Sequence, residues 1–527
     1  MAEWVGYFKK NPSCPFSHPP IQPSTTPPLH HLGIVQRQGI RNTLISYVGL
    51  AIGFVNTILV LPRLLSPAQI GLTAGVLVPL ATIGAQVAAF GFASAGMRYF
   101  PFFRNQGRNH AGFFPLLLGP PLLGFVVVAL LLWVGKPLVL QWYVRGHDAA
   151  LLAPHYLMVI GLAGCIMLGA LQDAYLKSLF HTSFSSFAQE ILLRLLLVGA
   201  AVAYSQHYLS FRGFVLAYTG AYAVVAVLLT LYLAAIGELH LRPTRAALRV
   251  KPLREMLGFG GFMLLSNISG TVLLNVDTML VGTKLSLAAA GIYIIATNVS
   301  TALVLPFRAL YKTAFSLIAE YWKEGDLAKM ADFYRRSTRI NTLLGCYLAL
   351  GIGLNLNFIY GLIHRPEYAA GTSAVLLLLA GRLVDGITGV NGIIVATSPR
   401  YRFDLLFNVS LAGAVVVLNW ILIPRFGLAG AALAYCVALV GINAARTWFV
   451  WRTYGLQPFD GRIARILLVA AVAGLAAWAP PEMPNAWLTL LLRGGVLTIV
   501  YGAGVLLTGT APELTSVWFA LRKKMGL

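Results

Sequence analysis

The sequence contains very little charge. Only 11% of its 527 residues are Asp, Glu, Lys or Arg, whereas a soluble chain carries about twice that fraction to cover its surface. Hydrophobic residues make up 58% of the chain, and the mean hydropathy is +0.76. This composition excludes a soluble globular protein and predicts a polytopic membrane protein.

Acidic residues are the scarcer of the two charged classes. There are 17 of them against 39 Lys and Arg, which gives a formal net charge of +22. Such an excess could indicate nucleic-acid binding, but the basic residues fall mainly in short loops between apolar runs. In that position they mark the orientation of membrane helices. We therefore expect no nucleic-acid partner.

The usual signatures of catalytic and metal sites are missing as well. Cys14 lies in a polar segment and Cys165, Cys346 and Cys436 lie inside apolar runs, so no disulfide framework is expected. The chain has no Gly-x-x-x-x-Gly-Lys-Ser/Thr loop for ATP and no cluster of metal-ligand residues. The loops between apolar runs are too short for a catalytic domain. We expect neither an enzyme nor a metal site nor a cofactor, apart from a coupling proton or sodium ion.

Both ends of the chain are polar. Residues 1–38 contain no continuous apolar run, which excludes a signal peptide. Prolines recur in this segment from Pro12 to Pro28 and predict a disordered cytoplasmic tail. Residues 511–527 include the basic run Arg522, Lys523 and Lys524 and are expected to form a basic cytoplasmic C-terminus.

Between these ends, long apolar runs dominate. A helix needs about 20 apolar residues to cross the hydrocarbon core, and about fourteen runs reach that length. They are 41–61, 70–96, 113–134, 150–176, 184–204, 212–236, 257–282, 288–317, 340–362, 372–397, 404–423, 428–450, 464–480 and 486–508. The runs are continuous rather than alternating with period two, which excludes a β-barrel. The predicted fold class is therefore all-α.

The basic residues orient these spans. If the N-terminus is cytoplasmic, about 26 Lys and Arg fall on the inner side and about seven on the outer side. A missed helix would destroy this alternation. Both termini are therefore predicted to be cytoplasmic.

Two distant stretches of the chain resemble each other. Val55-Asn56-Thr57 is answered by Val276-Asp277-Thr278, Leu65-Ser66 by Leu285-Ser286, and Gly71 by Gly291. Gly213 to Tyr218 is likewise answered by Gly430 to Tyr435. The offset is about 220 residues, which corresponds to six helices. An even number of helices keeps both copies in one orientation, so they should be related by a pseudo-twofold axis along the membrane normal.

The repeat divides the chain. We predict an N-terminal six-helix bundle over 39–237, a basic cytoplasmic linker over 238–256, a C-terminal six-helix bundle over 257–452, and transmembrane helices 13 and 14 within 453–510. Two like-oriented bundles leave a cleft near the midplane, and rocking one against the other opens it to alternate sides. The alternative is an ancient duplication kept only for packing.

Three segments give the chain a resemblance to a known family. They are "RNTLISYVGLAIGFVNTILVLPRLLSPAQIGL" (Arg41–Leu72), "FGFASAGMRYF" (Phe90–Phe100) and "NVDTMLVG" (Asn275–Gly282). In order and spacing over residues 40–510, the chain resembles the Wzx-type oligosaccharide flippases of the MATE-like exporter superfamily. The resemblance implies transport of an undecaprenyl-diphosphate-linked oligosaccharide from the cytoplasmic to the periplasmic leaflet, for surface polysaccharide biosynthesis.

The same resemblance implies a setting and partners. It places the chain in the bacterial cytoplasmic (inner) membrane, in contact with the lipid-linked oligosaccharide and membrane lipids. A polysaccharide polymerase is a candidate partner, and a monomer is expected. Two other functions stay open: a multidrug cation antiporter of the same superfamily, which would need an acidic cavity, and a membrane-embedded enzyme of cell-envelope glycan synthesis.

Ionisable residues within membrane spans are costly and mark transport pathways. In this chain they are Asp173, Arg194, Asp277, Arg308, Lys312, Arg382, Asp385, Arg446 and Arg493. Cations outnumber anions in this set, which suits an anionic cargo.

Arg308 and Lys312 are the first candidates for substrate binding. They are four residues apart, so they share one helix face, where a diphosphate could lie between them. Arg98, at the inner end of span two, is a similar candidate. The resemblance implies that spans one, two, seven and eight line the cavity, which favours all three. The alternative is that these side chains reach the lipid headgroups.

Two further groups have open roles. Arg382 either binds substrate or neutralises Asp385, three residues later. Asp277, with its repeat counterpart Asn56 and its neighbour Asn275, is assigned to coupling or gating. Asp277 could bind a proton or sodium ion, pair with an arginine, or form a structural hydrogen bond at the outer gate.

Overall fold

The computed structural model describes residues 41, 44–104, 110–143, 148–242 and 253–510. The tail predicted over 1–38, the C-terminus over 511–527 and most of the linker predicted over 238–256 lie outside these residues. Every regular element in the described part is a helix, which confirms the all-α class. The predicted domain boundaries stay predictions.

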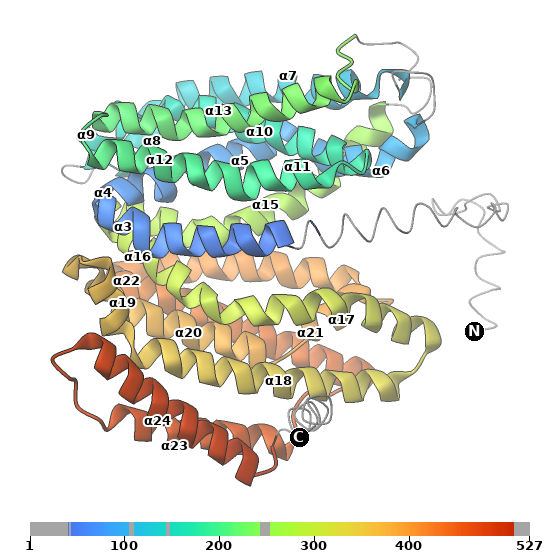
Figure 1. Cartoon of the computed structure of the whole chain (residues 1–527). Coiled ribbons are helices and arrows are strands. Elements are labelled where there is room, and N and C mark those ends of the chain that lie inside the picture. The colour runs from blue at the N-terminus through green and yellow to red at the C-terminus, as the bar shows by residue number, and fades with distance from the viewer. Residues whose placement is uncertain (1–40, 42–43, 105–109, 144–147, 243–252, 511–527) are drawn as a thin grey trace.

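Figure 1 shows the two halves of the chain as separate layers of roughly parallel helices. The first half contains the span Leu44–Leu64, with η1 (Asn56–Val60) and α3 (Leu61–Leu64) at its end, then α4 (Pro67–Ile70), η2 (Gly71–Leu77), α5 (Val78–Ala89), α6 (Phe92–Phe103), η3 (His110–Gly112), α7 (Phe113–Val134), α8 (Lys136–Tyr143), α9 (Asp148–Leu152), α10 (Met158–Ser178), α11 (Thr182–Ser186), η4 (Phe187–Leu192), α12 (Leu193–Ser205) and α13 (Phe211–Ala235).

The second half follows after the linker. It contains α15 (Leu253–Lys284), α16 (Leu287–Thr301), η5 (Ala302–Val304), α17 (Leu305–Glu324), α18 (Leu327–Leu354), α19 (Leu356–Ile363), η6 (Pro366–Gly371), α20 (Thr372–Ile387), α21 (Asn391–Thr397) and α22 (Arg402–Tyr454). Helices α23 (Gly461–Trp478) and α24 (Ala486–Leu507) lie at the far edge of this half (Figure 1).

Twelve helices in the described part are long and apolar enough to cross a membrane, or up to thirteen if α18 and α19, bent by 57°, form one span. Helix α22 is 53 residues long, which at 1.5 Å per residue is about 80 Å, far more than one crossing needs. Gly427 interrupts it with φ 58° and ψ −133°, a conformation that glycine adopts without a steric cost. The break separates the two runs predicted over 404–423 and 428–450. The count of fourteen and the overall symmetry stay predictions.

The hydrophobic core joins the halves at one end only. We call the end with Pro67 and Leu287 the outer end, following the predicted topology. One core cluster there combines residues of the first half, such as Leu72 and Val76, with residues of the second, such as Leu287 and Tyr293. Toward the inner end, one cluster belongs to the first half and Met256 of α15, and another belongs to the second half alone. The halves are therefore sealed at the outer end and packed separately at the inner end, apart from α15.

The outer seal contains a reciprocal contact between the repeats. A Cβ atom added to Gly71 would lie 1.8 Å from the Leu287 carbonyl oxygen, and one added to Gly291 would lie 2.0 Å from the Pro67 carbonyl oxygen. Pro67 corresponds to Leu287 in the repeat, as Gly71 corresponds to Gly291. The same contact is thus made twice with the partners exchanged, as a twofold axis requires. Asp148 adds a link at this end, since its Oδ2 accepts a hydrogen bond from the Leu287 amide at 2.9 Å.

Candidate functional site

Arg308 and Lys312 lie on α17, which packs against α18, α21 and η5 of the second half. Both side chains are exposed, and within the described residues neither has a hydrogen-bond or ion-pair partner. Arg308 lies close enough to the buried Arg382 for their charges to interact. The pair on α17 therefore presents two uncompensated positive charges beside the polar interior of the second half, where an anion would relieve their repulsion.

Arg98 lies where the halves touch at the inner end. It is exposed on α6, and its guanidinium lies 4.3 Å from the ring centre of Phe259 on α15. The neighbouring Tyr99 hydroxyl donates to Glu255 Oε1 at 3.5 Å. A cation–π contact uses the face of the guanidinium and leaves its N–H edge free. Arg98 can thus hold α6 against α15 and still bind an anion.

Arg382 is buried, and its side chain points toward α16 and η5. Its Nη1 donates to the Thr297 carbonyl at 2.9 Å, to Ser300 Oγ at 2.8 Å and to Thr301 Oγ1 at 2.6 Å. Asp385 instead accepts from Asn443 Nδ2 at 2.8 Å. Arg382 and Asp385 therefore make no direct hydrogen bond among the described residues, because each side chain finds partners on another helix. Their charges still interact, so their mutual neutralisation stays a prediction. The role of Arg382 in substrate binding stays a prediction.

Asp277 lies in a buried polar contact between three helices. Its Oδ1 accepts from Asn419 Nδ2 of α22 at 2.9 Å, and its Oδ2 accepts from the Tyr293 hydroxyl of α16 at 3.4 Å. The counterpart Asn56 is also buried, but its Oδ1 has no partner among the described residues. Asn275 donates to the Thr271 carbonyl of its own helix at 2.8 Å. Of these three residues, Asp277 alone joins different helices through its side chain.

Asp277→Asn copies the side chain at position 56 and should test the coupling role. We expect the protein to insert normally, because Asn retains a hydrogen-bond acceptor for Asn419. We expect gradient-driven transport to fall by about ten-fold or more, because an amide can neither take up a coupling proton nor balance the charge of a sodium ion. Transport assays with and without proton and sodium gradients measure this. Asn298→Ala, which removes an amide bonded only within its own helix, is the control. Unchanged transport and ion dependence in Asp277→Asn would leave the residue with a packing role only.

Arg446 is near enough to the end of a predicted span for its side chain to reach the headgroups. It is instead only partly exposed and turned into the second half, where Nη2 donates to Asn408 Oδ1 at 2.8 Å and contacts Asp404 Oδ1 at 3.4 Å. Asn408 Nδ2 in turn donates to Asp404 Oδ2 at 3.0 Å. Asp404 and Asn408 were not among the predicted site residues. Their spacing of four within one helical run was the signal that could have identified them.

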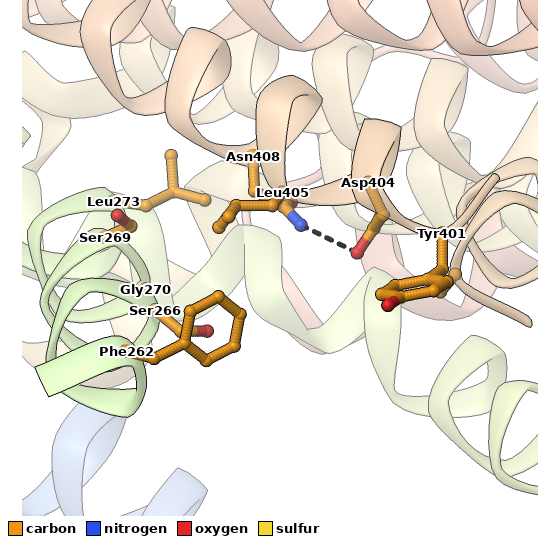
Figure 2. A pocket seen from close by; sticks show the side chains of 10 residues that line it. Phe262, Ser266, Ser269, Gly270, Leu273, Tyr401, Asp404, Leu405 and Asn408 are labelled. Atoms are coloured by element: carbon orange, nitrogen blue, oxygen red, sulfur yellow. Dashed lines mark hydrogen bonds between the residues drawn. The ribbon is translucent and has the colours of Figure 1, made fainter. Parts of the chain in front are cut away.

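These residues border a cavity of about 400 Å³. Figure 2 shows Phe262, Ser266, Ser269, Gly270 and Leu273 approaching it from α15 and Tyr401, Asp404, Leu405 and Asn408 approaching from α22, with Ala396 of α21 completing the lining. Asp404 and Asn408 are the polar groups on the α22 side. The cavity is large enough for a small ligand.

This chain is similar to known proteins both in sequence and in fold. Residues 175–355 match a family model described as "Polysaccharide biosynthesis protein". The structure titled "Lipid II flippase MurJ, inward closed conformation" matches with a TM-score of 0.71 and 12% identity, covering 90% of this chain and 100% of that one. The fold is that of the MATE-like transporters. The resemblance predicted from the sequence is confirmed, and the solved structures that this chain resembles are titled as a flippase and as transporters.

Two solved MATE structures in different states also share the fold. An "Inward-facing conformation of a multidrug resistance MATE family transporter of the MOP superfamily" matches with a TM-score of 0.61 and 13% identity, covering 78% of this chain and 96% of that one. An outward-facing MATE structure matches with a TM-score of 0.51 and 12% identity, covering 78% and 94%. The inward-facing arrangement is the better match.

Proposed function

We propose that this protein is a flippase that moves an undecaprenyl-diphosphate-linked oligosaccharide from the cytoplasmic to the periplasmic leaflet of a bacterial inner membrane. The observation that carries the proposal is the pair Arg308 and Lys312 on α17, which is exposed and has no partner among the described residues, in a protein whose halves pack separately at the inner end. We further propose that both termini lie in the cytoplasm.

The chemistry of the pair fits a diphosphate. Each cation within a span costs about 2.5–3.5 kcal/mol on insertion scales. Two cations without a counter-charge within a span therefore mark a functional site. A guanidinium can bind two phosphate oxygens at once, and an ammonium adds a mobile point charge. Arg98, at the contact between α6 and α15, would bind the same headgroup from the other half. Rocking of the halves about the outer seal would then expose the headgroup to the opposite side.

A multidrug cation antiporter shares the fold but would need exposed carboxylates for its cargo. The buried Asp277 is bonded to Asn419 and Tyr293, and Asp385 is bonded to Asn443. Both are occupied within the second half, which favours the anionic cargo. A coupling proton or sodium ion at Asp277 is compatible with either cargo.

Deletion of the gene tests the proposal. We expect the lipid-linked glycan to accumulate on the cytoplasmic leaflet and surface glycan to fall to background, because a diphosphate-linked sugar does not cross the hydrocarbon core unaided. Lipid extraction followed by glycan analysis measures the accumulated species, and re-expression of the wild-type gene is the control. Normal surface glycan in the deletion strain, with drug sensitivity instead, would favour the antiporter.

A further inference from the structure

Helix α15 belongs to both halves. Its outer part packs within the second half, where Asp277 binds Asn419 and where Leu273 contacts the cluster that includes Leu411. Its inner part lies against the first half, since a Cβ atom on Gly260 would lie 2.5 Å from the Phe90 carbonyl oxygen. Because α15 leaves the second half as it runs inward, a wedge opens between it and α22. The cavity in Figure 2 is this wedge.

The wedge combines aromatic rings with neutral hydrogen-bonding groups. Phe262 and Tyr401 are each more than half exposed, and Ser266 and Ser269 supply hydroxyls from α15. Asp404 supplies carboxylate oxygens from α22 (Figure 2). Aromatic faces and a few placed polar groups are the combination that recognises a ligand with both C–H and hydroxyl surfaces.

The charge in the wedge is compensated. Asp404 is paired with Arg446 at 3.4 Å and is further bonded to Asn408. Arg446 Nε is buried and has no partner among the described residues. The set has no net charge yet retains both donors and acceptors, which suits an uncharged polyhydroxyl compound better than a cation or a phosphate.

The first half contains a matched cavity of about 440 Å³. It is lined by Arg41, Ile45, His181, Ser183, Phe184, Phe187 and Tyr232. With the offset of 221 residues that matches Asn56 to Asp277, Ile45 corresponds to Ser266. With the offset of 217 residues that matches Gly213 to Gly430, Phe187 corresponds to Asp404. A cavity at this place is therefore a product of the repeated fold. The described lining of the first-half cavity is polar as well, with Arg41, His181, Ser183 and Tyr232, but it contains no carboxylate, whereas the wedge contains Asp404 bonded to Asn408.

We propose that the wedge is a subsite for the sugar nearest the diphosphate of the cargo. The wedge and the cationic pair are linked through one helix, because α21 supplies Ala396 to the wedge and packs against α17, which carries Arg308 and Lys312. With the diphosphate on α17, the first sugar can stack on Phe262 or Tyr401 and bind Asp404 and Asn408 through its hydroxyls. This inference rests on the proposed function and adds recognition of the glycan to recognition of the headgroup.

Binding of two lipids to the purified full-length protein in nanodiscs tests the subsite. The probes are bare undecaprenyl diphosphate and the glycan-bearing lipid extracted from the deletion strain. We expect the wild type to bind the glycan-bearing lipid about ten-fold more tightly, as two additional hydrogen bonds allow. Ser266→Phe fills the wedge without touching the Asp404–Arg446 pair and should remove this preference while leaving the affinity for the bare lipid unchanged. Ile45→Phe, at the matched position of the first half, should retain the preference.

The outcomes separate the subsite from the function. Equal binding of both lipids to the wild type, or a preference that survives both Ser266→Phe and Asp404→Asn, would overturn the subsite and leave the flippase intact. Failure of the wild type to bind either lipid would overturn the proposed function and the subsite with it.

Discussion

Replacing both Arg308 and Lys312 with alanine is expected to abolish transport of the lipid-linked glycan while the protein still reaches the membrane. Each charge-assisted contact to a phosphate contributes about 1.5–3 kcal/mol, so either single variant should transport roughly ten- to a hundred-fold less than the wild type. The double variant should fall below detection. Accumulation of surface glycan in the complemented deletion strain measures the effect.

A charge on the same helix provides the control. Lys323 is exposed in the last turn of α17, and Lys323→Ala removes one positive charge at the end of that helix, where headgroups are accessible. We expect near-normal transport from it. Arg308→Lys should transport more than Arg308→Ala but less than the wild type, because an ammonium cannot make the bidentate contact. Full activity of the double alanine variant would mean that both side chains only reach the headgroups.

Transport should also be highly sensitive to a single methyl group added at the outer seal. A Cβ atom at Gly71 or Gly291 would lie 1.8 Å or 2.0 Å from a carbonyl oxygen of the other half, far inside van der Waals contact, so backbone has to move. Gly71→Ala or Gly291→Ala is therefore expected to prevent the seal from forming and to reduce transport at least ten-fold. Gly71→Val and Gly291→Val should stop it altogether.

The reciprocity of this contact gives a sharper expectation. Because both substitutions break one seal, the double alanine variant should transport no less than the worse single variant, rather than showing the product of two losses. Gly220→Ala is the control, since a Cβ atom there meets nothing within 4 Å. The yield of monodisperse protein and the transport rate should be measured together. Normal transport in Gly291→Ala would mean that the outer contact does not open and close during the cycle.

The fold could be predicted because a membrane leaves a chain few choices. Spanning segments must satisfy their backbone internally, so long apolar runs become helices, and the basic loops orient them. The repeat also pointed to a physical contact, since the matched Gly71 and Gly291 turned out to touch the opposite halves. The break in α22 at Gly427 separates the two runs that hydropathy had distinguished.

The destinations of long side chains could not be predicted from spacing. Arg382 and Asp385 are three apart and could have paired, but Ser300, Thr301 and Asn443 from other helices supply better-placed partners. Arg446 was expected at the headgroups and instead binds Asn408 and Asp404. The wedge arises because α15 crosses from one half to the other. These features depend on tertiary packing, which a single sequence does not display.

The central claim is that α17 presents its cations to a water-filled space between the halves. Thiol accessibility tests it most directly: Arg308→Cys and Lys312→Cys, in a variant whose native cysteines are replaced, are exposed to a membrane-impermeant maleimide from the cytoplasmic side. The account predicts rapid labelling of both positions and protection by undecaprenyl diphosphate. Resistance to the water-soluble reagent, together with labelling by a lipid-soluble one, would place both side chains in the bilayer and contradict the account.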